Sequence, residues 1–143
     1  MAVLYRLYQN NNDKSPGKGK WYAKAVMTNV IDTKKLADIM QRNCTVKRAD
    51  IVAVIAELVE TMRDQLQHSH RVKLEGLGAF KLGLKSTGAA TAADFDVRKN
   101  IKGVHVVFTP ECTTDSAGRR TKILLEGVTV AELPKNTVNT DKP

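Results

Sequence analysis

The chain has 143 residues and a formal net charge of +8, with 42% hydrophobic and 27% charged residues. This length suits one compact domain and is marginal for two, and the composition is ordinary for a globular protein. No apolar run approaches the roughly 20 residues that a membrane-spanning helix needs, which argues against a helical membrane protein.

The charge distribution is more informative than the total. Positive charge is in excess in residues 1–35 and 68–108, on either side of a nearly neutral middle. Such an imbalance favours polyanions through phosphate contacts and counterion release, although a well-solvated basic protein is the alternative. The N-terminal stretch lacks a small-residue cleavage site, and two cysteines make no disulfide framework, so we expect a cytoplasmic protein without a secretory signal.

The first predicted element is a β-hairpin over residues 3–30. Residues 3–9 alternate between apolar and polar positions, and residues 21–30 resume this strand pattern. Between them, NNNDKSPGKGK at residues 10–20 is a turn-rich basic loop. The loop could contact phosphates, but a mobile, solvated loop is the commoner role for such a segment.

Two helices are predicted next. A short helix over residues 33–42 can be capped by Asp32 or Thr33, and a longer one over about 46–67 can be capped by Thr45. The apolar stripe of the longer helix contains Ile51, Val52, Ile55, Leu58, Val59, Met62 and Leu66. A stripe of this width fits either a helix-mediated dimer or burial within the core of one chain, and the sequence leaves both open.

Strands are predicted over residues 72–85, 95–111 and 120–133, while 86–94 is small and low in complexity. Gly76 and Gly78 are unusual in the first of these strands. Glycine weakens a strand interior unless the backbone bends or another group approaches closely. The C-terminal tail, residues 134–143, is predicted to be disordered.

The sequence contains no recognisable catalytic or metal-binding pattern. His68 and His70 lie two apart in a polar turn without a third ligand nearby, so a surface turn is the commoner explanation. His105 also lacks an obvious acidic partner, and the GLG at residues 76–78 leads into a strand rather than a helix. We therefore expect no enzyme, cofactor, metal ion or small-molecule substrate.

The order of short helix, long amphipathic helix, turn and VKLEGLGAFKL resembles the HU/IHF family of bacterial histone-like DNA-binding proteins. The family pattern is close to V-x-L-x-G-F-G-x-F, and this chain matches it at Val72, Leu74, Gly76, Gly78 and Phe80, with Leu77 between the glycines. VVFTPE at residues 106–111 is similar to the family's V-x-A-F-x-P-G segment. The resemblance covers roughly residues 31–111. The flanking segments resemble the extended HU variants of Bacteroides-type bacteria.

This resemblance implies an α+β fold with a helical base, a β-sheet saddle and a β-ribbon arm, plus an added N-terminal β-hairpin and C-terminal strand. The expected organisation is a hairpin extension (1–30), an HU-like domain with the C-terminal strand (31–133) and the tail (134–143). It also implies a homodimer in the bacterial nucleoid that binds and condenses double-stranded DNA largely without sequence specificity. Such proteins enter the minor groove and bend the duplex.

The predicted arm departs from the family pattern. The family carries R-N-P-x-T-G near the arm tip, with the proline as a wedge, whereas residues 81–107 contain no proline. VRKN at residues 97–100 keeps only part of that motif, and we assign no residue to the wedge. A protein–protein assembly module on an HU-like fold, with weak or lost DNA binding, is therefore the alternative. The edge-capable strands at 3–9 and 120–133 also suggest it.

The candidate DNA-binding residues are basic side chains of two kinds. Those of the predicted saddle and arm are Lys73, Lys81, Lys85, Arg98, Lys99 and Lys102. Lys34, Lys47 and Arg48 lie near predicted helix N-termini, where backbone N–H groups and the helix dipole favour phosphates.

Overall fold

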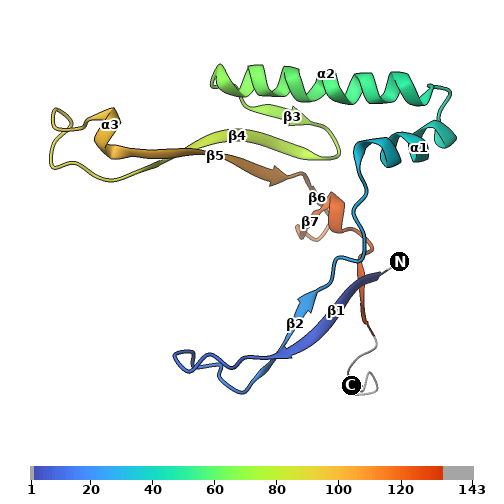
Figure 1. Cartoon of the computed structure of the whole chain (residues 1–143), viewed down its shortest axis with the longest axis horizontal. Coiled ribbons are helices and arrows are strands. Elements are labelled where there is room, and N and C mark those ends of the chain that lie inside the picture. The colour runs from blue at the N-terminus through green and yellow to red at the C-terminus, as the bar shows by residue number, and fades with distance from the viewer. Residues whose placement is uncertain (1, 134–143) are drawn as a thin grey trace. The chain divides into compact units, whose positions relative to one another are not determined.

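The computed structural model describes residues 2–133, which fall into two compact units (Figure 1). The described part of the first unit comprises residues 2–31 and 127–133, and the second comprises residues 32–126. The predicted disordered tail lies outside the described residues. No helix within residues 2–133 is both long enough and apolar enough to cross a membrane.

The first unit is a three-stranded sheet in the order β2-β1-β8. Its strands are β1 (Ala2–Gln9), β2 (Trp21–Ala25) and β8 (Thr129–Glu132). β1 pairs antiparallel with β2, which confirms the predicted hairpin, and parallel with β8. The interpretation of residues 3–9 as an edge-capable strand is therefore partly wrong, because Ala2–Tyr5 of β1 pair with β8.

The loop between β1 and β2 folds back on its own strands. The backbone N–H of Asn10 donates to the carbonyl of Lys20 (2.9 Å), and that of Gly19 donates to the carbonyl of Asn10 (2.7 Å). The hydroxyl of Tyr22 lies against Gly17 and occupies the space that a Cβ would need there. The loop thus has internal contacts that hold it against β2, which the sequence did not predict.

The second unit begins with α1 (Thr33–Asn43) and α2 (Arg48–Gln67). Asp32 caps α1 by accepting the backbone N–H of Lys35 at 2.8 Å, which confirms one of the two predicted caps. Thr45 does not cap α2, because this helix begins later than predicted and Lys47 is its N-cap residue without a capping side chain. Arg48 instead forms an ion pair with Asp38 across the corner between the helices.

A three-stranded antiparallel sheet lies along one side of α2 (Figure 1). Its strands, in the order β3-β4-β5, are β3 (Val72–Leu74), β4 (Gly78–Ser86) and β5 (Ile101–Pro110). In the β4–β5 ladder Gly78 lies opposite Pro110 and Lys85 opposite Gly103, with an irregularity between Lys85 and Ser86. The prediction of a continuous strand over 95–111 is partly wrong, because α3 (Val97–Asn100) is a single helical turn.

The end of the second unit differs from the prediction. β6 (Cys112–Thr114) and β7 (Arg120–Lys122) pair as a short hairpin, and the 3₁₀-helix η1 (Ile123–Leu125) follows. The predicted single strand over 120–133 is therefore wrong. β7 and β8 join different sheets because η1 and the turn at Gly127, with φ of +71°, separate them.

The buried apolar core of the described chain is small. Its buried hydrophobic residues are Ala37, Ile51, Leu66 and Ala79. On α2, by contrast, Leu58 and Val59 of the apolar stripe are 39% and 59% exposed. Part of the apolar stripe on α2 is therefore not covered by residues 2–133, which bears on the choice between dimer and single-chain core that the sequence left open.

Candidate nucleic-acid interface

Two glycines shape the connection between β3 and β4. Gly76 has φ of +80° in a turn that closes with a hydrogen bond from the N–H of Leu77 to the carbonyl of Leu74 (3.1 Å). Gly78 has φ of +146°, and a Cβ there would overlap the carbonyl of Thr109. Gly76 therefore supplies a turn conformation, and Gly78 permits the close approach of β4 to β5.

Glu111 ties this turn to β3. Its carboxylate accepts the N–H of Gly76, and its Oε1 lies 3.0 Å from the Nζ of Lys73. The hydrogen bond between the two side chains is the main cause that lowers the pKa of Glu111 and raises the pKa of Lys73. Lys73 also lies 3.6 Å from Glu75, so carboxylates of its own chain already neutralise part of its charge.

One face of the β3–β4–β5 sheet is apolar and faces α2. Leu82 and Val106 line a cavity of about 380 Å³ together with Leu66 of α2. Phe80 and Phe108 lie opposite each other in the ladder on this same side, with ring centroids 4.7 Å apart. Because successive residues of a strand point to opposite faces, the intervening residues of β4 point away from α2.

The face away from α2 carries three of the predicted lysines. Lys81 and Lys85 lie four residues apart on β4 and so share a face, and Lys73 lies opposite Ala79 on the same side. We call Lys73, Lys81 and Lys85 the basic sheet face. His105 joins it opposite Gly83, where the imidazole lies so close that a Cβ would be 2.8 Å from its Nε2. Neither β4 nor β5 contains an acidic residue.

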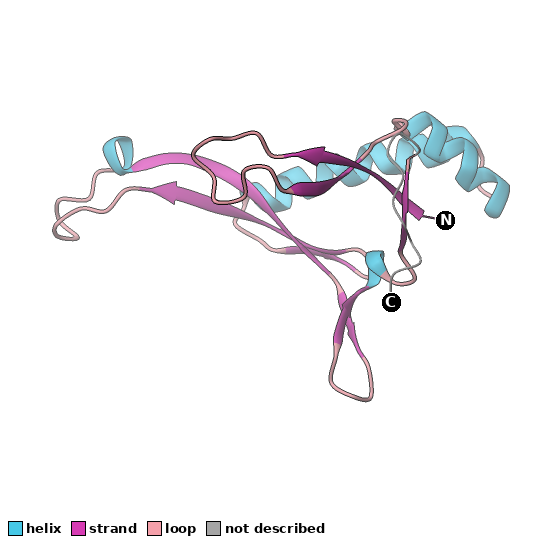
Figure 2. Cartoon of the chain, turned by 90° about the horizontal axis from the view of Figure 1, so that it is seen from below, coloured by secondary structure: helices cyan, strands magenta, loops and turns pink. Residues whose placement is uncertain are grey.

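The far end of the β4–β5 pair is closed by Asn100. Its side-chain amide donates to the carbonyls of Thr87 (3.1 Å) and Gly88 (3.2 Å), and its backbone carbonyl accepts the N–H of Thr87 at 2.8 Å. Asp96 accepts the backbone N–H of Arg98 at 2.8 Å and so caps α3. In Figure 2 this small helix lies at the end of the two long strands.

The nine predicted residues do not form one site. Lys34 lies in the first turn of α1, and Lys47 and Arg48 lie at the start of α2. Arg98 and Lys99 belong to α3, at the opposite end of the unit in both views (Figures 1 and 2). Lys102 follows α3 in β5, next to the ladder irregularity. The basic sheet face is the group whose members share one face of the β3–β4–β5 sheet.

Sequence reasoning missed Arg71 and Arg120. Together with Lys73 they line a pocket of about 260 Å³ that also includes Ala79 and Thr109, which lie on the side of the sheet away from α2. Arg71 directly precedes β3, so its place in the sequence could have indicated that it lies near Lys73. Arg120 reaches the pocket through the β6–β7 hairpin, whose strand pairing has no clear sequence pattern.

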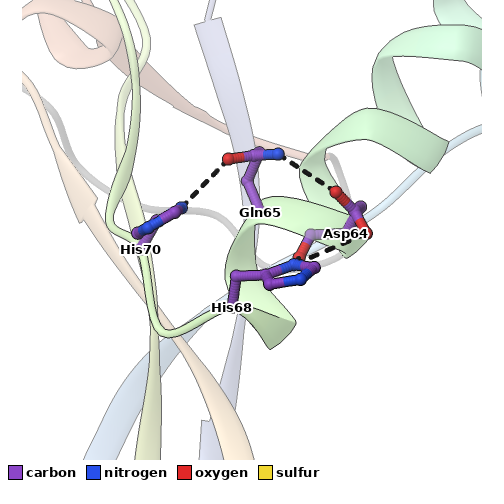
Figure 3. A network of polar contacts seen from close by, with 4 residues as sticks. All are labelled: Asp64, Gln65, His68 and His70. Atoms are coloured by element: carbon purple, nitrogen blue, oxygen red, sulfur yellow. Dashed lines mark hydrogen bonds and ion pairs between the residues drawn. The ribbon is translucent and has the colours of Figure 1, made fainter.

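The turn after α2 holds His68 and His70 in a polar network (Figure 3). The Nδ1 of His70 is 3.0 Å from the side-chain oxygen of Gln65, whose amide donates to Asp64 at 3.0 Å. The Nδ1 of His68 is 2.8 Å from the carbonyl of Asp64. These contacts end the helix and orient the chain toward Arg71. Within residues 2–133 no group of three or more His, Cys, Asp or Glu side chains could hold a metal ion.

Comparison with known proteins gives two findings. Residues 1–123 match the HU-HIG family, described as an HU domain fused to wHTH, Ig, or glycine-rich motif. The chain is also similar to a crystal structure from Bacteroides vulgatus ATCC 8482, of a protein to which DNA binding has been ascribed. That similarity has a TM-score of 0.60 at 19% identity and covers 94% of this chain and 50% of the other, so it supports a shared fold. No curated protein sequence matches the chain.

Proposed function

Because the chain belongs to the HU-HIG family, we propose that it is an architectural DNA-binding protein that binds duplex DNA largely without sequence specificity. The observation that carries this proposal is the basic sheet face, which places Lys73 of β3 and Lys81 and Lys85 of β4 on one side of the sheet. Cations gathered on one surface can contact the phosphates of a duplex, and each neutralised phosphate releases counterions. Arg71 and Arg120 extend the cationic surface at the base of the sheet.

In this proposal the β3–β4–β5 sheet is the saddle, and the part of β4–β5 that leads to α3 is the arm. Arg98, Lys99 and Lys102 then contact phosphates farther along the duplex, and Lys34, Lys47 and Arg48 act at the helix N-termini. Residues 1–30 are an extension of an HU-like domain over 31–133, although pairing with β1 draws β8 of that domain into the sheet of the extension.

The functional form that we propose is a homodimer in the cytoplasmic nucleoid. Within the described residues, the apolar stripe of α2 and the apolar face of the sheet stay partly uncovered, as the 59% exposure of Val59 and 60% exposure of Val106 show. A monomer rarely leaves a large contiguous apolar patch in water, and a second copy would cover it. Light scattering after size exclusion should give twice the mass of one chain, and a monomer would contradict this part of the proposal.

Duplex binding measured over a salt series tests the main proposal. The logarithm of affinity should fall linearly with the logarithm of salt concentration, and Lys81→Ala should reduce that slope by about 1. Arg63→Ala is the matched control, because Arg63 lies on α2 and pairs with Glu60. No binding at low salt, or binding that salt does not weaken, would contradict the proposal.

A second candidate function is an assembly module on the same fold, with weak or lost DNA binding. The exposed apolar face of the sheet favours it, because that face can bind other chains as well as a second copy. The full chain would then form species larger than a dimer without DNA and would not shift a duplex in a gel.

A further inference from the structure

The sheet of the first unit carries a second cationic surface, on β1 and β2. The antiparallel register places Arg6 opposite Lys24, and Tyr8 opposite Tyr22. Residues two apart on a strand share a face, so these four side chains form one block of two cations beside two aromatic rings. We call Arg6, Tyr8, Tyr22 and Lys24 the hairpin platform.

The two cations of the hairpin platform have no carboxylate partner in the described part of the chain. Like charges directly opposite each other destabilise a strand pair. Within residues 2–31 and 127–133 the acidic residues are Asp13 and Glu132. Asp13 pairs with Lys18 in the loop, and Glu132 lies opposite Tyr5, on the other face of the sheet. An anion from outside this unit is therefore the natural counterion for Arg6 and Lys24.

The two tyrosines favour a ligand that carries flat rings as well as negative charge. Tyr8 and Tyr22 are 50% and 40% exposed, and their ring centroids are 6.0 Å apart. The loop holds Tyr22 in place through the contact of its hydroxyl with Gly17. A groove of about 840 Å³ lies beside Tyr8 and is lined in part by Arg6 and Lys24. Exposed aromatic rings beside cations are the combination that binds flat bases joined by phosphates.

We infer that the hairpin platform binds single-stranded nucleic acid, with phosphates at Arg6 and Lys24 and bases stacked on Tyr8 and Tyr22. In a duplex the faces of the bases are covered by their neighbours, so the rings would add little to duplex binding. An acidic peptide would use the cations but has no bases to stack. The inference goes beyond the duplex-binding function proposed above and uses a different unit of the chain.

Fluorescence anisotropy of the full chain with a labelled oligothymidine and with a duplex tests this inference. Tyr8→Ala should weaken binding of the oligothymidine about 5- to 150-fold, the range expected for the loss of one stacked base, and leave duplex affinity unchanged. Tyr8→Phe keeps the ring and should bind like the parent protein. Trp21→Ala is the aromatic control, because Trp21 is 60% exposed but lies opposite Gln9, on the other face.

The cations are tested separately, so that a folding defect of Tyr8→Ala would not decide the result. Arg6→Gln with Lys24→Gln should weaken the oligothymidine complex and lower its salt slope by about 1.4. Lys14→Gln with Lys18→Gln removes the same charge from the loop, where Lys18 pairs with Asp13, and should have a smaller effect.

Three results would overturn the inference. The first is unchanged oligothymidine affinity in the Arg6→Gln and Lys24→Gln double variant. The second is an equal loss of single-strand and duplex binding in a folded Tyr8→Ala variant. The third is competition by polyglutamate as effective as competition by unlabelled oligothymidine, which would indicate an acidic protein partner instead. Failure of duplex binding alone would overturn the proposed function and leave this inference standing.

Discussion

The two faces of the β3–β4–β5 sheet come from the same strands but carry opposite chemistry. The face toward α2 presents apolar side chains such as Leu82 and Val106, and the other face presents Lys81 and Lys85 without an acidic residue in β4 or β5. The alternation of a strand places the two sets of side chains on opposite faces. One face can therefore serve assembly while the other serves DNA, and substitutions on either face should affect one property and spare the other.

The largest effect is expected on the apolar face. Leu82→Asp places a carboxylate in the cavity that Leu82 shares with Leu66 and Val106, where the one cation of the lining, Arg63, already pairs with Glu60. Burying this carboxylate in the proposed dimer costs about 3 kcal/mol or more, so the variant should lose the dimer and unfold at a lower temperature. Sedimentation and thermal unfolding measure this. Leu82→Met conserves the volume and should remain dimeric. A dimeric, stable Leu82→Asp protein would show that the apolar face is not an interface.

The second-largest effect is expected from a substitution at Gly78, where the backbone of the same sheet is tightly packed. Gly78→Ala would push a methyl group into the carbonyl of Thr109 and to 2.9 Å from the Cα of Pro110, at a φ of +146°. We expect a loss of about 2–4 kcal/mol in the free energy of unfolding, measured with urea. Gly88→Ala is the matched control, because nothing lies within 4 Å of a Cβ there. Equal stability of the two variants would refute the proposed role of Gly78.

Substitutions of the cations in α3 should change DNA binding and leave dimerisation and stability unchanged. Arg98→Ala with Lys99→Ala removes two cations from α3 and should weaken duplex binding by a similar factor for every sequence. The salt slope should fall by about 2 in an equilibrium titration, while dimer mass and unfolding stay as in the parent chain. A change that depends on base sequence would mean that α3 reads bases rather than phosphates.

The sequence predicted those parts of the molecule that depend on local patterns. Asp32 was recognisable as a cap from its position, and the alternation around Lys81 correctly implied a strand. The sequence did not reveal the pairing of β8 with β1 or the approach of Arg120 to Lys73, because contacts between distant segments leave no periodic pattern. The partial neutralisation of Lys73 was hidden for the same reason, since Glu111 is far from it along the chain.

The smallest predicted effect concerns the pair of Lys73 and Glu111, which should influence both the stability of the sheet and its affinity for a duplex. Glu111 has a lowered pKa, so the stability from its contacts is present above the ordinary carboxyl pKa and is lost as the pH falls through the lowered value. The raised pKa of Lys73 acts at the other end, and its contribution is lost only as the pH rises through that raised value.

Glu111→Gln removes the carboxylate from this pair. The variant should unfold at a lower temperature than the parent chain near neutral pH, and the gap should close as the pH falls through the lowered pKa of Glu111. At neutral pH it should also bind a duplex slightly more tightly, because Lys73 loses its intramolecular partner. Thermal unfolding across the pH series and anisotropy at one salt concentration measure the two effects. Parallel stability curves with unchanged duplex affinity would mean that the pair limits neither property.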